Sequence, residues 1–152
     1  MTDRVRRRLA KLGAMSWRDR FLLAEAVVWL AVARVALWLP FRWLAPRLGE
    51  TMAESVERDG PENELGSRVA WAIGTASHVT PWATRCLAEA MAAKAMLRMR
   101  GVRTTLYLGM AKDERGEFRA HAWLRCGTRY LTGEAAMREY TVIAKFAESD
   151  LA

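Results

Sequence analysis

Apolar residues recur at helical spacing through the first hundred positions, and alternation with a period of two replaces this pattern after residue 101. The longest apolar run covers Phe21 to Leu39 and is followed by Pro40, which predicts a long helix that ends there. Ser16-Trp17-Arg18-Asp19 precedes the run and has the form of a capping box. A shorter amphipathic turn should follow and end at Gly49.

The apolar run 21–39 is long enough to cross a bilayer, but its two charges argue against a span. Glu25 and Arg34 would each cost about 2.5–3.5 kcal/mol in hydrocarbon. Nine positions separate them, so at about 100° per residue they lie on opposite sides of the helix and cannot pair. We expect a helix that packs on the core or lies against a membrane, and a peripheral membrane contact stays open as a further expectation.

Two more helices are predicted in the middle of the chain. Asp59-Gly60-Pro61 breaks the chain, and a helix restarts at Glu62 with apolar residues at helical spacing. Thr80-Pro81-Trp82 then signals another helix start, with Thr84 as an alternative cap, and this helix should run to Arg100 and end at Gly101. We therefore divide the chain at a hinge near residue 60 into residues 1–60, a basic arm with the apolar helix, and residues 61–152, which hold the later helices and the predicted strands.

A β-hairpin is predicted after Gly101. Thr105–Leu108 and Phe118–Leu124 are the two strands, with a charged turn between them and His121 in the middle of the second. Gly127-Thr128 offers a two-residue type II′ turn into a third strand. Helices followed by a small antiparallel sheet make an α+β fold.

The choice of turn residues decides which residue of the third strand pairs with His121. With Gly127-Thr128 as the turn, Glu134 lies directly opposite His121 and can hold the ring. With Cys126-Gly127 as the turn, Thr132 faces His121 instead and Glu134 is a diagonal neighbour. The assignment of Glu134 depends on the first of these registers.

Composition and charge describe a globular chain with a basic N-terminus. Its 152 residues are 52% hydrophobic and carry a net charge of +7, with 20 Arg and 4 Lys. Five basic residues fall within the first eleven positions: Arg4, Arg6, Arg7, Arg8 and Lys11. We favour a solvated leading turn over a dedicated site for lipid, nucleic acid or an acidic partner. No secretory signal is evident, so we expect a cytoplasmic protein with reduced thiols.

The chain offers little for a metal or cofactor site. Its two cysteines and two histidines, at 78, 86, 121 and 126, are separated by 7, 34 and 4 residues, which matches no zinc finger or ribbon. We therefore expect neither metal nor cofactor. Cys126 at a hairpin edge and His78 at a helix end have no catalytic context.

Cys86 is the candidate nucleophile. It falls in the opening turns of a predicted helix, where the partial positive charge of the helix N-terminus favours thiolate over thiol, and Arg85 beside it adds to that effect. A lone cysteine among Leu87, Ala90 and Met91 is more often a small core residue. The order of Cys86, then His121 on a strand, then Glu134 is nevertheless the order of a cysteine enzyme with nucleophile, base and orienting acid.

Three segments together resemble the B protein of lasso-peptide biosynthesis, and in particular its stand-alone leader-peptidase half. They are Pro81-Trp82-Ala83-Thr84-Arg85-Cys86-Leu87, the stretch from Gly101-Val102 to Leu106-Tyr107-Leu108-Gly109, and Ala120-His121-Ala122-Trp123-Leu124. The resemblance covers about residues 65–146, and an N-terminal apolar helix is also typical of the family. It implies a transglutaminase-like, papain-like cysteine-peptidase core.

The resemblance implies a cysteine endopeptidase that removes the leader from a ribosomally made lasso precursor peptide. Such an enzyme would act with a small leader-recognition protein, ahead of a separate macrolactam-forming cyclase. Cys86 would be the nucleophile and His121 the general base. Where relatives often place an Asp after the histidine strand, this chain has Glu134 as its first carboxylate.

Three further residues are the expected substrate contacts: Trp82, Arg85 and Trp123. The two tryptophans are also ordinary core residues. The length of 152 residues leaves no room for a second recognition domain, which again favours a partner protein.

Two alternatives remain. One is another Cys-His acyl-transfer enzyme, an amidase or a transglutaminase. The other is a non-catalytic adaptor that binds a membrane surface through the basic arm and apolar helix. Nucleic acid is not an expected partner, because no recognised binding motif accompanies the charge.

Overall fold

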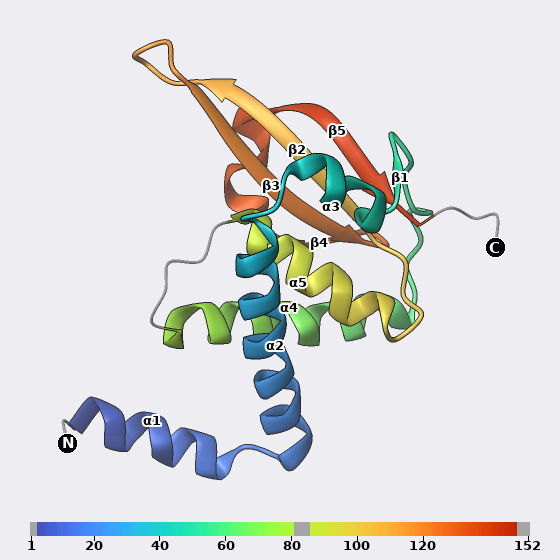
Figure 1. Ribbon diagram of the computed structural model, residues 1–152. Coiled ribbons are helices and arrows are strands. Elements are labelled where there is room, and N and C mark those ends of the chain that lie inside the picture. The colour runs from blue at the N-terminus through green and yellow to red at the C-terminus, as the bar shows by residue number, and fades with distance from the viewer. Residues whose placement is uncertain (1–2, 81–85, 149–152) are drawn as a thin grey trace.

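A computed structural model describes residues 3–80 and 86–148, and Figure 1 shows the arrangement of their helices and strands. The helices are α1 (Asp3–Ala14), α2 (Trp17–Ala36), α3 (Phe41–Leu48), α4 (Pro61–Val79), α5 (Cys86–Arg98) and the 3₁₀ helix η1 (Glu134–Glu139). The strands are β1 (Glu50–Thr51), β2 (Thr105–Lys112), β3 (Phe118–Cys126), β4 (Arg129–Thr132) and β5 (Thr141–Ala147). The predicted combination of helices with a small antiparallel sheet is confirmed.

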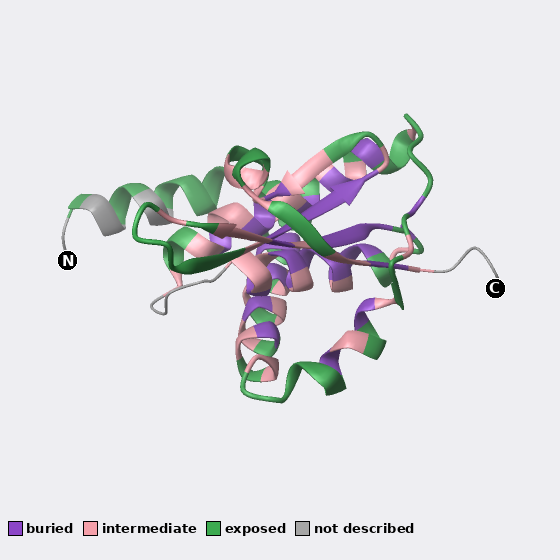
Figure 2. Cartoon of the chain, turned by 90° about the horizontal axis from the view of Figure 1, so that it is seen from above, coloured by how far each residue is buried: buried purple, intermediate pink, exposed green. Residues whose placement is uncertain are grey.

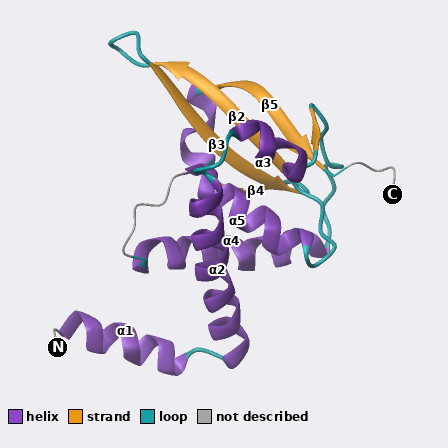
Figure 3. Cartoon of the chain, viewed as in Figure 1, coloured by secondary structure: helices purple, strands orange, loops and turns teal. Residues whose placement is uncertain are grey.

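The five strands form one antiparallel sheet in the order β1-β5-β2-β3-β4. Figure 3 shows the sheet above the crossing helices α2, α4 and α5. Helix α5 packs against β3, β2 and β4, and α2 crosses both α4 and α5. Figure 2 shows buried residues gathered where helices and sheet meet, while the described side chains of α1 and the tip of the β2–β3 hairpin are exposed.

Helix α2 begins and ends close to the predicted positions. The backbone N–H of Asp19 donates to the Ser16 hydroxyl at 3.2 Å, so the predicted N-cap is formed, and Pro40 precedes α3. Leu22, Ala26 and Leu30 of α2 are buried in the same core as α4, α5 and the sheet. Within the described residues, no helix is long and apolar enough to cross a membrane.

The acidic residue of the apolar run has an ion-pair partner. Glu25 accepts two hydrogen bonds from Arg100 just beyond α5, at 2.6 and 2.8 Å, and both side chains are half-buried. This bidentate contact joins residues 75 positions apart, which the local sequence pattern does not indicate.

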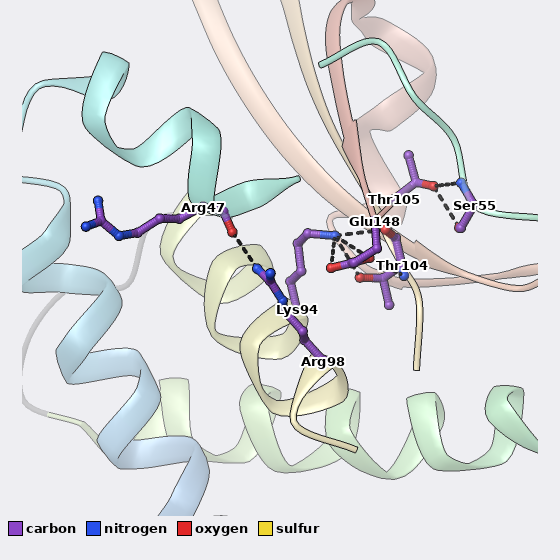
Figure 4. A network of polar contacts seen from close by, with 7 residues as sticks. All are labelled: Arg47, Ser55, Lys94, Arg98, Thr104, Thr105 and Glu148. Atoms are coloured by element: carbon purple, nitrogen blue, oxygen red, sulfur yellow. Dashed lines mark hydrogen bonds and ion pairs between the residues drawn. The ribbon is translucent and has the colours of Figure 1, made fainter. Parts of the chain in front are cut away.

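A buried ammonium group joins α5 to the end of the sheet (Figure 4). Lys94 is 2% exposed, and its Nζ lies 2.9 and 3.1 Å from the two carboxylate oxygens of Glu148 and donates to the backbone carbonyl of Thr104 at 2.8 Å. Burial lowers the pKa of Lys94, and the Glu148 carboxylate opposes that shift. Arg98, one turn later, donates to the carbonyl of Arg47 at the end of α3.

The predicted β2–β3 hairpin is confirmed. The predicted pairing of β3 with β4 is correct next to the turn and wrong further along the strands. Cys126 pairs with Arg129 around Gly127, which has φ 52° as the expected turn requires. The pairing then shifts by one residue, from Arg125 with Tyr130 to Leu124 with Thr132, so Leu131 is an extra residue in β4. Neither predicted partner of His121 is therefore the residue opposite it.

Candidate active site

His121 lies at the centre of β3, half-buried, with its ring held by the backbone of a neighbouring segment. Its Nε2 is 2.8 Å from the carbonyl oxygen of Gly133. A carbonyl oxygen can only accept a hydrogen bond, so Nε2 carries the proton. In the neutral ring, Nδ1 then holds the free electron pair and is the atom able to act as a base.

Aromatic rings fix the plane of the His121 ring. Trp123 stacks on it with ring centroids 5.9 Å apart, and Tyr140 lies at 5.0 Å. Tyr107 stacks in turn on Trp123, at 5.6 Å and an interplanar angle of 11°. The three aromatic side chains come from β3, β2 and the junction of η1 with β5, so several elements together orient the imidazole.

Two glycines make room for this arrangement. Gly109 pairs with His121 across β2 and β3, and a Cβ placed there would lie 2.8 Å from the Trp123 ring and from Cβ of Tyr140. Gly133 has φ 71°, a conformation that favours glycine, and a Cβ there would lie 2.5 Å from the Ala122 carbonyl oxygen and 2.9 Å from Nε2 of His121. Sequence reasoning missed both, although a glycine within a strand is a known signal of close approach.

A buried polar network supports Trp123 from the far side. The Tyr107 hydroxyl donates to Glu54 at 2.8 Å and accepts from Nε of Arg125 at 2.9 Å. Burial raises the pKa of Tyr107 to about 12, and the hydrogen bond from Tyr107 lowers the pKa of Glu54. Arg125 also donates to the carbonyl of Ser55, so the loop after β1 is fixed to this face of the sheet.

Cys86 is the first described residue of α5. It is half-buried and packs, with Leu87 and Met91, against the hydrophobic core. The predicted helix after residue 80 is thus present from Cys86 to Arg98, followed by Gly101 with φ 71°. Residues 81–85, which include the predicted start of this helix, lie outside the described part of the chain.

The structure brings the cysteine helix and the histidine strand together but not the two reacting groups. Helix α5 packs on the face of β3 that carries Ala122 and Leu124, and alternation along the strand turns His121 and Trp123 to the other face. Among the described residues, no hydrogen bond joins the Cys86 thiol to the His121 ring. The pairing of these two residues in catalysis therefore stays a prediction.

Glu134 does not lie opposite His121, and that register prediction is wrong. Pairing of β4 with β3 ends at Thr132, and the left-handed conformation of Gly133 turns the chain into η1, where Glu134 is exposed. The extra residue Leu131 is the physical reason, because it displaces every later position by one. The backbone of Gly133 occupies the place where a carboxylate was expected; a catalytic role for Glu134 itself stays untested.

The other sequence-predicted residues fall into three groups. Trp82 and Arg85 lie outside the described residues. Trp123, predicted to contact substrate, is 4% exposed, so its position suits holding His121 rather than binding peptide. Cys126 is fully buried, and burial raises the pKa of its thiol, whereas His78 is exposed in the last turn of α4. Among the described residues, no cluster of His, Cys, Asp and Glu could hold a metal ion.

Comparison with known families decides the class of protein. The sequence model of the transglutaminase-like superfamily matches residues 26–145, from within α2 to within β5. The chain belongs to the transglutaminase-like superfamily. Both Cys86 and His121 fall within the matched region, and membership in this superfamily points to cysteine-based peptidase or acyltransferase chemistry. No curated protein and no solved structure gives a significant match to the chain.

Proposed function

We propose that this transglutaminase-like protein is a cysteine endopeptidase that removes the leader from a lasso precursor peptide, with Cys86 as nucleophile and His121 as base. The observation that carries the proposal is the hydrogen bond from Nε2 of His121 to the Gly133 carbonyl. It leaves Nδ1 as the basic atom of a ring that Trp123 and Tyr140 contact, with Tyr107 stacked on Trp123. Orientation of the base by a third group is what nucleophilic catalysis by cysteine requires.

The proposed reaction has two steps. The Cys86 thiolate attacks the scissile carbonyl carbon, and backbone N–H groups near the start of the helix stabilise the oxyanion. Protonated Nδ1 of His121 then gives its proton to the leaving amine, which departs as the core peptide and leaves a thioester. A water molecule gives its proton to Nδ1 and its hydroxide to the thioester carbon, which releases the leader as a carboxylic acid and restores the Cys86 thiolate and protonated His121.

The reaction requires a rearrangement that brings the imidazole, on the face of β3 opposite α5, to the Cys86 thiol, since no hydrogen bond joins them here. Catalytic hydrogen bonds are often long or poorly aligned in structures without substrate, and alkylation tests whether the two groups meet in solution. The choice of a lasso precursor, of a separate leader-recognition protein and of a cyclase that acts next rests on the sequence resemblance. Superfamily membership supports only the cysteine chemistry.

Alkylation by iodoacetamide tests the Cys86–His121 pair without any substrate. Intact mass is followed against pH for the wild type, His121→Gln and a Cys126→Ala control, with peptide mapping to locate the label. An ordinary thiol loses reactivity about tenfold per pH unit below its ionisation near pH 8.5. If His121 activates Cys86, the wild type stays reactive in mild acid and His121→Gln does not. Identical pH profiles in the two proteins would contradict the pair.

Cleavage is then measured by intact mass with a candidate lasso precursor and its recognition protein. A leader fragment with a free carboxylate, absent in Cys86→Ala and His121→Gln variants that remain folded, supports the peptidase. A product formed only when an amine is added identifies a transglutaminase. Cleavage that survives the loss of Cys86 overturns the proposal and favours a non-catalytic adaptor.

A further inference from the structure

Helix α2 exposes a continuous apolar stripe on the side opposite its core contacts. Phe21, Val28, Val32 and Val35 form the stripe and are 66%, 60%, 47% and 57% exposed. At about 100° per residue they lie within about 60° of one another around the helix axis. The buried residues of α2, such as Ala26 and Leu30, lie on the other side. A surface helix normally presents polar residues here, and the described residues leave this apolar face exposed.

Exposed tryptophans come before and after the stripe along the chain. Trp17 at the start of α2 is 73% exposed, and Trp38 and Trp43, which flank the turn into α3, are 80% and 54% exposed. Tryptophan is enriched where a protein surface meets the headgroup layer of a bilayer, because one side of the ring is apolar and the N–H is polar. We call the stripe and these three tryptophans together the α2 face.

A groove beside the stripe adds apolar surface. It has a volume of about 410 Å³, lies between α2, α3 and α5, and shares Val32 with the stripe. The basic residues Arg47 and Arg98 also line the groove, as does Met99, which is 67% exposed.

The positive charge of the protein is concentrated in the same part of the chain. Residues 1–48 contain ten Lys and Arg against three Asp and Glu, whereas residues 49–152 contain fourteen of each. The whole net charge of +7 therefore belongs to α1, α2 and α3 and their connections. Helix α1 projects away from the rest of the molecule (Figure 1), with Arg6, Arg7 and Lys11 exposed.

The acidic residues of α2 do not offset this charge at the surface. Asp19 forms an ion pair with Arg68 of α4 at 3.0 Å, and Glu25 forms one with Arg100. Arg18, next to Trp17 in the chain, and Arg42, between Phe41 and Trp43, are exposed. An acidic group approaching the α2 face thus meets basic side chains together with exposed aromatic and aliphatic ones.

We infer that the α2 face, with α1, docks on an anionic lipid bilayer. Basic residues beside an exposed apolar helix face and tryptophans are the combination that holds a helix in the plane of a membrane interface. The chain lies on the bilayer and does not cross it, in keeping with the charges of Glu25 and Arg34 within α2 and with the ion pair of Glu25 and Arg100. This inference does not depend on the proposed peptidase activity.

Vesicle sedimentation tests the inference with the full chain. The protein is mixed with vesicles of phosphatidylcholine alone and with equimolar phosphatidylcholine and phosphatidylglycerol. We expect binding to the anionic vesicles, and a marked loss of binding when NaCl rises from about 0.1 M to about 1 M, which shortens the Debye length from about 10 Å to about 3 Å. Absence of binding to anionic vesicles at low salt overturns the inference.

Matched substitutions locate the contact. Phe21→Ser should lower the partition coefficient about tenfold, while Phe118→Ser, at a residue with the same 66% exposure on the β2–β3 hairpin, should leave it unchanged. Arg18→Gln and Arg42→Gln should each lower it about fivefold, against no change for Arg115→Gln in the hairpin turn. Circular dichroism confirms that each variant is folded. Equal effects of the two Phe substitutions overturn the docking face.

Two further outcomes assign the face to a different occupant. If light scattering shows a dimer that Phe21→Ser converts to a monomer, and vesicles do not bind, the face is an interface between copies. If vesicle binding depends on the arginines but not on Phe21, the attraction is purely electrostatic and no apolar face is inserted. Either result contradicts the inference, while neither bears on alkylation of Cys86.

Discussion

Gly109 lies directly across the β2–β3 ladder from His121. The Trp123 ring occupies the space that a side chain at position 109 would need. A Cβ at this position would meet the Trp123 ring and Cβ of Tyr140, each at 2.8 Å. The contact with Tyr140 is at its Cβ, which is attached to the backbone, so rotation of the Tyr140 side chain cannot relieve the clash. The position of the candidate base therefore depends on a residue with no functional group.

We predict that Gly109→Ala displaces Trp123 and Tyr140 and with them the His121 ring. The overpacking should lower the free energy of unfolding by about 1–3 kcal/mol in urea denaturation. If His121 raises the rate of Cys86 alkylation in mild acid, Gly109→Ala should reduce that rate as well. Gly74→Ala is the control, since Gly74 lies within α4 and nothing lies within 4 Å of a Cβ there. That variant should gain about 0.5–1 kcal/mol, and destabilisation of both to the same extent would contradict the prediction.

Gly133→Ala should disturb the His121 ring directly. The new methyl group would press on Nε2 of His121 and on the Ala122 carbonyl. Gly101→Ala is a close control, because Gly101 has the same φ of 71° but open space around it. Both variants carry the strain of a left-handed alanine, so the extra loss of unfolding free energy in Gly133→Ala measures the steric conflict. The NMR signals of the His121 ring should move only in that variant.

Lys94→Met should be among the most destabilising single changes in the helices. It leaves the Glu148 carboxylate and the Thr104 carbonyl without their buried cationic partner, so we expect a loss of about 3–5 kcal/mol in unfolding free energy. Adding Glu148→Leu should recover much of that loss, because no unpaired charge then remains. Arg68→Ala, which breaks the exposed pair with Asp19, should change stability little. A double variant no more stable than Lys94→Met would contradict this account.

The raised pKa of Tyr107 should make the free energy of unfolding depend on pH in alkali. Burial raises its pKa from 10.0 to about 12, so between these values the unfolded chain gives up the phenol proton before the folded chain does. The unfolded state then binds fewer protons, and the free energy of unfolding falls as pH rises from 10 to 12. Tyr107→Phe should show a shallower decline over that range in urea denaturation. Its tyrosinate absorbance should also lack a component near pH 12; an unchanged titration would contradict the assignment.

The fold could be predicted where the signals were local. The Ser16 cap, Pro40, Gly101 and the Gly127 turn each act within a few residues, and each lies where the sequence predicted. The bonds of Glu25 with Arg100 and of Lys94 with Glu148 join residues 75 and 54 positions apart, and no local pattern specifies them. Nothing in the hydrophobic alternation of β4 marks Leu131 as an extra residue.

The candidate site was predictable in its residue types but not in its geometry. Cys86 and His121 stand out because helix starts and strand centres carry recognisable patterns. Tyr107 and Tyr140, by contrast, reach the His121 environment only through strand pairing and through the turn after η1. The orienting group escaped prediction because a backbone carbonyl is present at every position and leaves no mark in a sequence.

The carbonyl of Gly133 has a consequence for how the protein tolerates acid and mutation. A carboxylate in that place would gain a proton as the pH falls and release the ring, whereas an amide oxygen does not titrate in the range where proteins stay folded. Nε2 keeps its proton whether or not Nδ1 is protonated, so the hydrogen bond to the Gly133 carbonyl should hold the His121 ring in both states. No single codon change can delete a main-chain oxygen, so this acceptor can be lost only if the turn at Gly133 itself is rebuilt.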